Sequence, residues 1–170
     1  MKNILIIRSA NFSVIDILID YINNNNERVN IYFLAQESAK DILKEKVEES
    51  RIFSLPNGIF DYKVLKNNKK LISEIKKREY DEIYIPSSYE EFEGFEEVKL
   101  IATYIKSNKL FLFNCFGSIS EFTLSFNKLF FNNKILFPFK FIIAFLVTTS
   151  IYLSGVIYHI IKYHILKREI

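Results

Sequence analysis

The chain has 170 residues, of which 49% are hydrophobic, and its formal net charge is +3. This length allows one compact domain with an appendage. Cys115 is the single cysteine, which excludes an intrachain disulfide and so a disulfide-stapled secreted domain. Residues up to Gly117 carry 17 basic and 18 acidic side chains, whereas the rest carry 6 and 2. The balanced first part gives no argument for nucleic-acid binding, and the basic, aromatic tail favours an anionic membrane surface.

Strands and helices alternate in the part of the sequence before Gly58. Residues 3–8 form a short apolar run, NILIIR, that is typical of a strand buried on both faces. Ser13 is placed to cap a helix that ends near Asn23. Five apolar residues fall on one face of this helix: Val14, Ile17, Leu18, Tyr21 and Ile22. A strand, a short polar helix and a third strand follow, at residues 29–34, 37–45 and 51–55, before the turn Pro56-Asn57-Gly58.

The same alternation continues to Phe113. A helix, a strand, a second helix and a fifth strand are expected at residues 68–78, 81–85, 95–106 and 109–113. Apolar residues mark the inner faces of the two helices: Leu71, Ile72 and Ile75 in the first, and Val98, Ile101, Ala102 and Ile105 in the second. The pattern predicts an α/β domain over residues 1–117 with a doubly wound, five-stranded parallel, Rossmann-like sheet. One residue of each strand is expected in its buried interior: Ile6, Ile31, Ile52, Ile83 and Leu112.

The composition changes after Gly117. Residues 118–140 are rich in Phe and Lys, and residues 141–161 then carry no formal charge over 21 positions. As a helix, this run is about 32 Å long, which matches one hydrocarbon core. We therefore predict an interfacial segment at 118–140, a membrane-embedded helix at 141–161 and a basic tail at 162–170. A buried core helix is disfavoured because the preceding domain is too small to enclose so long an apolar helix.

The charges that flank the apolar run leave its orientation close to a tie. Three cations precede it and three follow it: Lys128, Lys134 and Lys140, then Lys162, Lys167 and Arg168. The apolar run at the N-terminus ends at Arg8 after four residues, which is too short for the core of a signal peptide. We therefore expect a cytoplasmic N-terminal domain on a single-pass or monotopic membrane protein. A helix that kinks near Pro138 and re-enters is the alternative.

In a parallel sheet of this kind, ligands bind at the carboxyl ends of the strands. The loop at residues 8–13 leads from the first strand to a helix N-terminus, which is a natural anion site. This loop has no glycine, so it matches neither a dinucleotide fingerprint nor a P-loop. The alternative is an ordinary strand-to-helix turn with a serine cap.

The loop that follows the fourth strand has five Glu among residues 90–97. Glu96 and Glu97 suit the start of a helix because carboxylates offset the helix dipole. Glu90, Glu91 and Glu93 lie where a substrate could bind, and Glu93 is the candidate catalytic carboxylate. The alternative is a solvated acidic loop.

Other chemistry is weakly represented. His159 and His164 are five positions apart, which is the wrong spacing for a shared metal site on one helix face. The sequence before His159 has no histidine, which excludes a Ser-His-Asp set there. We predict neither a metal nor a cofactor, and we interpret Cys115 as a small buried or loop residue.

The opening strand, Ile4-Leu5-Ile6-Ile7-Arg8, and its serine-containing loop resemble the N-terminal half of a glycosyltransferase-B enzyme of the heptosyltransferase type. The resemblance covers residues 2–117 and implies an acceptor-side half. The family carries a Gly-Asp pair in this loop, and its Asp is the proposed base; here Ser13-Val14 occupies that place, and Asp16 falls inside the helix. The apolar helix stands in place of the family's second, nucleotide-sugar-binding half, so the resemblance implies a half that is either pseudo-enzymatic or completed by another polypeptide.

Two hypotheses follow. The first is a membrane-anchored glycosyltransferase-like subunit for envelope polysaccharide or glycolipid assembly, with a lipid-linked or glycan acceptor. The second is a non-catalytic membrane-tethered scaffold that binds a protein partner. In the glycosyltransferase hypothesis, Arg8 is expected to bind a phosphate of the lipid carrier. The alternative is an ion pair between Arg8 and a Glu of residues 90–97. The remaining substrate-binding candidates are Ser9, Asn11, Ser13, Ser87, Ser88, Tyr89 and Asn114.

Overall fold

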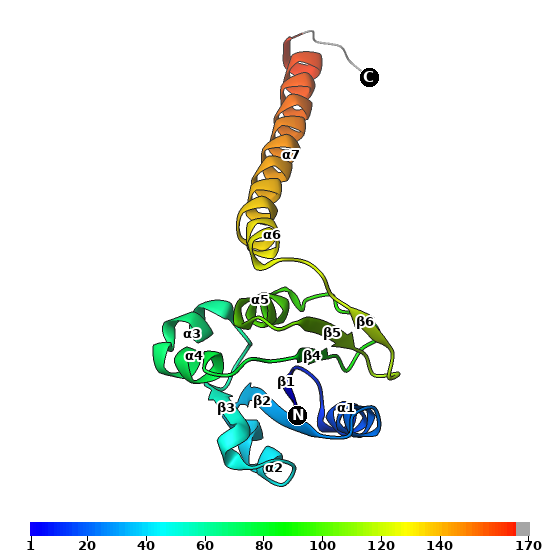
Figure 1. Ribbon diagram of the computed structural model, residues 1–170. Coiled ribbons are helices and arrows are strands. Elements are labelled where there is room, and N and C mark those ends of the chain that lie inside the picture. The colour runs from blue at the N-terminus through cyan, green and yellow to red at the C-terminus, as the bar shows by residue number, and fades with distance from the viewer. Residues whose placement is uncertain (166–170) are drawn as a thin grey trace. The chain divides into compact units, whose positions relative to one another are not determined.

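A six-stranded sheet is the centre of the computed structural model, which describes residues 1–165 (Figure 1). The strand order is β3-β2-β1-β4-β5-β6. The strands are β1 (Lys2–Ile7), β2 (Val29–Gln36), β3 (Ile52–Leu55), β4 (Glu82–Pro86), β5 (Lys109–Phe113) and β6 (Ile119–Glu121). The first five pair in parallel, and β6 pairs antiparallel with β5. The predicted α/β fold class is confirmed.

The sixth strand is a difference from the predicted sheet of five parallel strands. The chain reverses after β5 through a turn in which Gly117 adopts a φ of +77° and its N–H bonds to the carbonyl of Asn114. Strand β6 then returns along β5, with Ile119 opposite Phe113. This strand has only three residues, two of them polar, so it carries too little apolar pattern to be recognised from the sequence.

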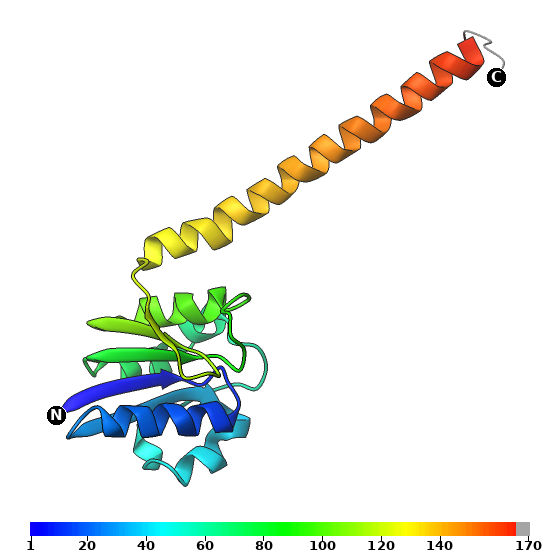
Figure 2. The ribbon, with the colours of Figure 1, turned by 90° about the vertical axis from the view of Figure 1, so that its right-hand side faces the viewer.

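Helices cover both faces of the sheet (Figures 1 and 2). They are α1 (Phe12–Asn24) and α2 (Lys40–Lys44) on one face, and α3 (Tyr62–Asn67), α4 (Lys69–Lys76) and α5 (Glu96–Ile105) on the other. The short 3₁₀ turns Glu37–Ala39 and Glu49–Arg51 flank α2. Right-handed crossovers produce this arrangement because the chain moves outward from β1 to β3 and then crosses back to β4.

Strands β1 and β4, at the centre of the sheet, are its most deeply buried strands. Ile4, Leu5, Ile6 and Ile7 are all fully buried, as expected for a parallel strand with helices on both sides. Ile4 and Ile6 belong to the apolar cluster under α1, and the pleat directs Leu5 and Ile7 to the opposite face. Of the five interior residues predicted, Ile6, Ile31, Ile52 and Ile83 are buried, whereas Leu112 is half-buried.

Helix α1 differs from its prediction at its cap and on one face. The cap is Asn11, whose Oδ1 accepts hydrogen bonds from Val14 N at 3.1 Å and from the Ser13 hydroxyl at 2.8 Å. The residues that pack against the sheet are Val14, Ile15, Leu18 and Ile22. Ile17 and Tyr21 are 47% and 37% exposed, because the apolar stripe that meets the sheet is centred on Ile15, Leu18 and Ile22.

The chain divides into two compact units, Met1–Leu129 and the part that begins at Phe130. One continuous helix, Phe126–Tyr163, is 38 residues long and apolar enough to cross a membrane. It comprises α6 (Phe126–Phe131), a π turn at Asn132–Leu136, α7 (Phe137–Ile160) and the start of a π turn at Ile161–Ile165. The most apolar stretch of this helix has no buried residue.

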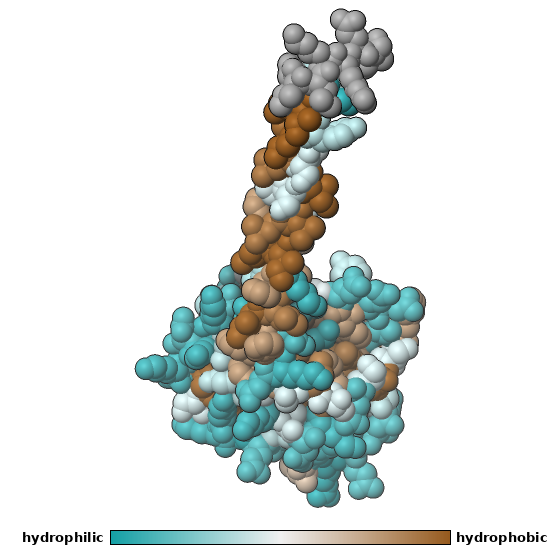
Figure 3. Space-filling model, turned by 90° about the horizontal axis from the view of Figure 1, so that it is seen from above, coloured by the Kyte–Doolittle hydropathy of each residue, from teal (hydrophilic) through white to brown (hydrophobic). Residues whose placement is uncertain are grey.

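The surface of this helix is mostly hydrophobic, whereas polar side chains cover most of the visible face of the α/β domain (Figure 3). Pro138 lies inside this continuous helix, directly after the π turn Asn132–Leu136, which is where the helix accommodates a residue without a backbone N–H. The predicted uncharged run, 141–161, lies almost entirely within α7. Lys167 and Arg168 of the predicted basic tail lie outside the described residues.

Replacing Ile83 with Ala is expected to lower the free energy of unfolding by about 2–5 kcal/mol, because the fully buried side chain leaves a cavity. Urea unfolding of the full chain in a mild detergent measures this change. Ile17→Ala is the control, because that side chain is half exposed and its loss should cost well under about 1 kcal/mol. Equal losses at both positions would contradict the strand assignment.

Candidate functional site

The carboxyl ends of β1 and β4 mark the point where the sheet reverses its strand order. The loop after β1 leads to α1 on one face, and the loop after β4 leads to α5 on the other. Such a switch point is where open parallel sheets bind ligands, because the two loops separate and leave a crevice. Most of the predicted site residues lie in these loops or in the neighbouring loop after β5.

Hydrogen bonds join the loops after β1 and β4. The Ser9 hydroxyl donates to the carbonyl of Pro86 at 2.7 Å and lies 3.2 Å from that of Ile7. The backbone N–H of Asn11 donates to Ser88 Oγ at 2.9 Å. The structure therefore brings Ser9, Asn11 and Ser88 together, and their contacts connect two loops that the fold would otherwise leave apart.

The loop after β4 is held from within by Ser87, which is fully buried. Its hydroxyl donates to the carbonyl of Glu91 at 3.2 Å and accepts from Tyr89 N at 3.0 Å. Its backbone N–H donates to the carbonyl of Phe113 at 2.8 Å, which extends the sheet pairing. Ser87 thus shapes the acidic loop, and its hydroxyl already has two partners.

Asn114 connects the loops after β4 and β5. It is buried, and its Nδ2 donates to the carbonyl of Glu90 at 3.3 Å. Its Oδ1 accepts from the backbone N–H groups of Phe116 and Ser118 at 3.0 and 2.9 Å. The amide therefore supports the reversal that leads into β6.

Arg8 is the charged group at the centre of this edge. Its Nη1 donates to Gln36 Oε1 at 3.2 Å, and its guanidinium carbon lies 4.7 Å from the centre of the Phe12 ring. Burial lowers the pKa of Arg8 from its ordinary value, but a guanidinium remains protonated at neutral pH. Its Nε is buried and has no hydrogen-bond acceptor among the described residues.

Arg8 has no carboxylate partner within the described part of the chain, so the alternative ion pair with a Glu of residues 90–97 is not formed there. Glu93 is exposed, next to Gly94, whose φ is +77°. Glu97 instead accepts a hydrogen bond from Tyr62 N at 3.0 Å and so ties the start of α5 to α3. The positive charge of Arg8 is therefore not neutralised by a neighbouring side chain.

Gln36 and Phe12 are site residues that the sequence reasoning missed. Gln36 ends β2, and its Nε2 also donates to the carbonyl of Gly58 at 3.3 Å, so it connects Arg8 to the loop after β3. The end of β2 was recognisable as part of this edge, but the pairing across 28 residues was not. Phe12 falls in the loop that the sequence marks, and its ring holds the guanidinium in place.

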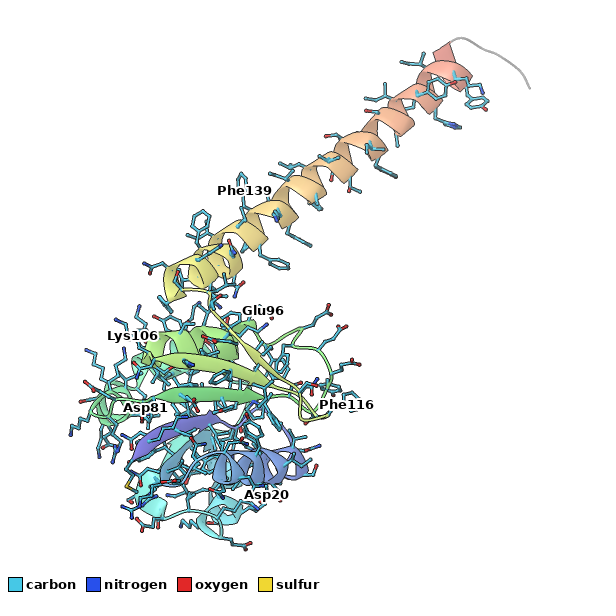
Figure 4. All side chains as sticks on the ribbon, turned by 45° about the vertical axis from the view of Figure 1, so that its right-hand side comes forward. Asp20, Asp81, Glu96, Lys106, Phe116 and Phe139 are labelled. Atoms are coloured by element: carbon cyan, nitrogen blue, oxygen red, sulfur yellow. The ribbon has the colours of Figure 1, made fainter. Side chains whose placement is uncertain are left out.

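Three apolar or aromatic side chains stand out at the tips of this edge. Ile59, Tyr89 and Phe116 follow β3, β4 and β5, and they are 92%, 73% and 74% exposed. Figure 4 shows Phe116 at this end of the domain, opposite the end that carries Lys106 and Asp81. Strands β2, β1 and β4 lie between β3 and β5, so these are separate exposed side chains along one edge and not a single apolar patch.

Chemically, the edge offers one guanidinium and the N-terminal N–H groups of α1, which together favour an anion. Within residues 1–165, no three His, Cys, Asp or Glu side chains are arranged to hold a metal ion. Comparison with known proteins identifies no family: no family model, curated protein or solved structure matches the chain.

Replacing Asn114 with Ala is expected to lower the free energy of unfolding by about 1–3 kcal/mol, because two loop N–H groups lose their acceptor. Asn114→Asp keeps an acceptor oxygen but replaces the Nδ2 donor to the Glu90 carbonyl with a buried carboxylate oxygen, so it should lose at least as much stability as the Ala variant. Urea unfolding of the full chain in detergent compares the two variants. A loss well under about 1 kcal/mol in the Ala variant would mean that the hydrogen bonds of Asn114 do not stabilise this reversal of the chain.

Proposed function

We propose that the chain is a membrane-anchored, glycosyltransferase-like subunit that binds the phosphate of a lipid-linked glycan acceptor. A partner protein would supply the nucleotide-sugar-binding half. The observation that carries this proposal is the guanidinium of Arg8, which lies at the carboxyl end of the central strand without a carboxylate partner in the described residues.

The surroundings of Arg8 suit a phosphate. A guanidinium forms charge-assisted, often bidentate hydrogen bonds with phosphate oxygens. Phe12 and Gln36 hold one side of the group, while the buried Nε still needs an acceptor. Arg8 is also separated by only a short turn from the N-terminus of α1, whose dipole attracts anions, although Asn11 already caps the N–H of Val14 there.

The same edge supports binding better than catalysis by this chain alone. Ser13-Val14 stands where the resembled family has its Gly-Asp pair, and the α/β domain contains no histidine. Glu93 remains the candidate catalytic carboxylate, in an exposed loop that a partner would have to cover before it could act on a sugar. Transfer is therefore proposed for the complex.

A lipid-linked acceptor is consistent with the apolar helix. Residues 141–161 provide about 32 Å of uncharged helix, and Lys128, Lys134 and Lys140 precede it in the chain. Such a helix would keep the domain and a membrane-bound acceptor at the same surface, which raises their effective concentration. We propose that the N-terminal domain faces the cytoplasm.

A second function, a non-catalytic scaffold, is favoured by a different observation. Tyr89 is exposed directly before the acidic residues 90–93, and Ile59 and Phe116 are exposed elsewhere along the same edge. An anionic leaflet would repel these carboxylates, so this combination suits a protein partner with basic and apolar side chains. The scaffold function requires no bound phosphate.

Membrane anchoring is tested by fractionation. The full chain is expected in the membrane fraction and should stay there through alkaline carbonate extraction, because a spanning helix resists the treatment that strips peripheral proteins. A chain that lacks residues 130–170, and so keeps the compact unit Met1–Leu129 with β6, should be released into the soluble fraction. Recovery of the full chain among the soluble proteins would end the anchoring proposal.

Sugar transfer by the proposed complex is tested with two variants. Arg8→Ala removes the proposed phosphate ligand, and Glu93→Gln removes the candidate catalytic carboxylate. Each is expected to lower sugar transfer to lipid by tenfold or more, about 1.4 kcal/mol of barrier, in membranes that contain the partner. The measurement is incorporation of labelled sugar from a nucleotide sugar, and the purified chain alone should show none.

Arg28→Ala is the matched control, because Arg28 is exposed just before β2, away from the carboxyl edge. Its activity should equal that of the unchanged chain. Normal transfer by both the Arg8 and the Glu93 variants would exclude this edge as the site and leave the scaffold function.

A further inference from the structure

A cavity of about 850 Å³ opens at the amino edge of the sheet, at the end opposite the candidate site. It lies between the end of α5, the first residues of β5 and the segment that runs from Glu121 to Asn127. All of its lining residues belong to the unit Met1–Leu129. Nothing in the proposed function makes use of this cavity.

Aromatic contacts fix one wall of the cavity. The ring of Phe126 lies 5.6 Å from that of Tyr104 and 5.3 Å from that of Tyr62, and the Tyr62 and Tyr104 rings meet edge to face at 5.1 Å. The next part of the wall is held by Phe122, whose N–H donates to the carbonyl of Leu110 at 2.8 Å. The cavity wall thus combines these packed rings with the irregular segment 122–125, which is anchored at its two ends by Phe122 and Phe126.

Three lysines line the cavity against one carboxylate. They are Lys76, Lys106 and Lys109, and the carboxylate is Glu121. The ammonium of Lys76 lies 3.5 Å above the centre of the Tyr104 ring, which holds it over this wall. Among the described residues, none of the three lysines forms an ion pair. The cavity thus has an excess of positive charge.

Lys106 has an unusual backbone. It directly follows α5 with φ 73° and ψ 142°, and it is the single non-glycine residue of the described chain with a positive φ. Glycine is the usual residue at such a helix end, because a side chain is disfavoured at positive φ. A lysine here also offsets the negative end of the α5 dipole, but that role does not explain Lys76 and Lys109.

We propose that this cavity binds a phosphate group, with Lys76, Lys106 and Lys109 as its cationic ligands and the aromatic wall as a surface for the attached organic group. Ammonium groups are compact point charges that pair well with phosphate. An anionic ligand would account for the excess of positive charge in the cavity. It would also account for a lysine at position 106, where the positive φ favours glycine.

Chain length favours the headgroup of an anionic phospholipid as the source of this phosphate. Asn127 lines the cavity and precedes the uncharged run at Phe141 by 14 residues, or at most about 21 Å of helix. The cavity is therefore tethered within reach of the headgroup layer of any membrane that the apolar helix enters. The assignment of the phosphate to a phospholipid rests on the proposed membrane anchoring. Phosphate binding by the three lysines does not depend on that anchoring.

The test measures the thermal unfolding midpoint of the full chain in a mild detergent against three probes. These are short-chain phosphatidylglycerol, the matching phosphatidylcholine and soluble glycerol phosphate. Phosphatidylglycerol is expected to raise the midpoint at concentrations about tenfold lower than phosphatidylcholine does. Lys76→Gln, Lys106→Gly and Lys109→Gln should each weaken this effect by about threefold or more.

Two controls separate the site from general surface charge. Lys77→Gln changes the neighbouring lysine, which does not line this cavity, and should leave the response to phosphatidylglycerol unchanged. Lys106→Gly should raise the midpoint without ligand, because it relieves the positive φ, while it weakens binding. Loss of binding in a variant of higher stability cannot come from unfolding.

The responses to the three probes show whether the cavity binds phosphate and whether that phosphate belongs to a lipid or to a soluble molecule. A response to glycerol phosphate as strong as that to phosphatidylglycerol supports the phosphate site and assigns it to a soluble ligand. Equal responses to both phospholipids without one to glycerol phosphate, or equal losses in the Lys76 and Lys77 variants, would overturn it. Carbonate extraction and the Arg8 variants test the proposed function independently of these results.

Discussion

The burial of β1 on both faces is the constraint on which the rest of the domain depends. Residues 4–7 are fully buried, so helices must cover the sheet on each side. The crossovers that provide this cover send the chain to one face after β1 and to the other after β4. The switch point at the carboxyl edge, and with it the position of Arg8, is a consequence of that packing.

The two edges of the sheet differ in how their polar groups are used. At the carboxyl edge, Ser9, Ser87 and Asn114 form hydrogen bonds that hold the loops together, so little besides Arg8 remains to bind a ligand. At the amino edge, lysines surround an open cavity without ion-pair partners in the described chain. The carboxyl edge of the sheet is thus held together by hydrogen bonds and has one cation, Arg8, that is unpaired in the described chain. The amino edge has three lysines around a cavity.

The regular elements follow closely from local patterns. Strand β5 has the predicted bounds, and the four apolar residues expected on the inner face of α5 are all buried. These elements depend on periodicity within ten residues or fewer, which the sequence displays directly. The apolar helix is recognisable for the same reason, because length and absence of charge are properties of a single segment.

The sequence alone determined the order of the five parallel strands, the doubly wound α/β class and the single long apolar helix, but it did not reveal α3 or β6. The tertiary structure decided which loops meet: Asn11 and Ser88 are 77 residues apart, and Arg8 and Gln36 are 28 apart. The Asn11 cap and strand β6 are local features that the sequence reasoning missed, whereas the tertiary structure decided that Lys76 joins Lys106 and Lys109 at one cavity. Local patterns reflect each segment's own burial, whereas these contacts depend on the packing of segments far apart in the chain, which no short window of sequence contains.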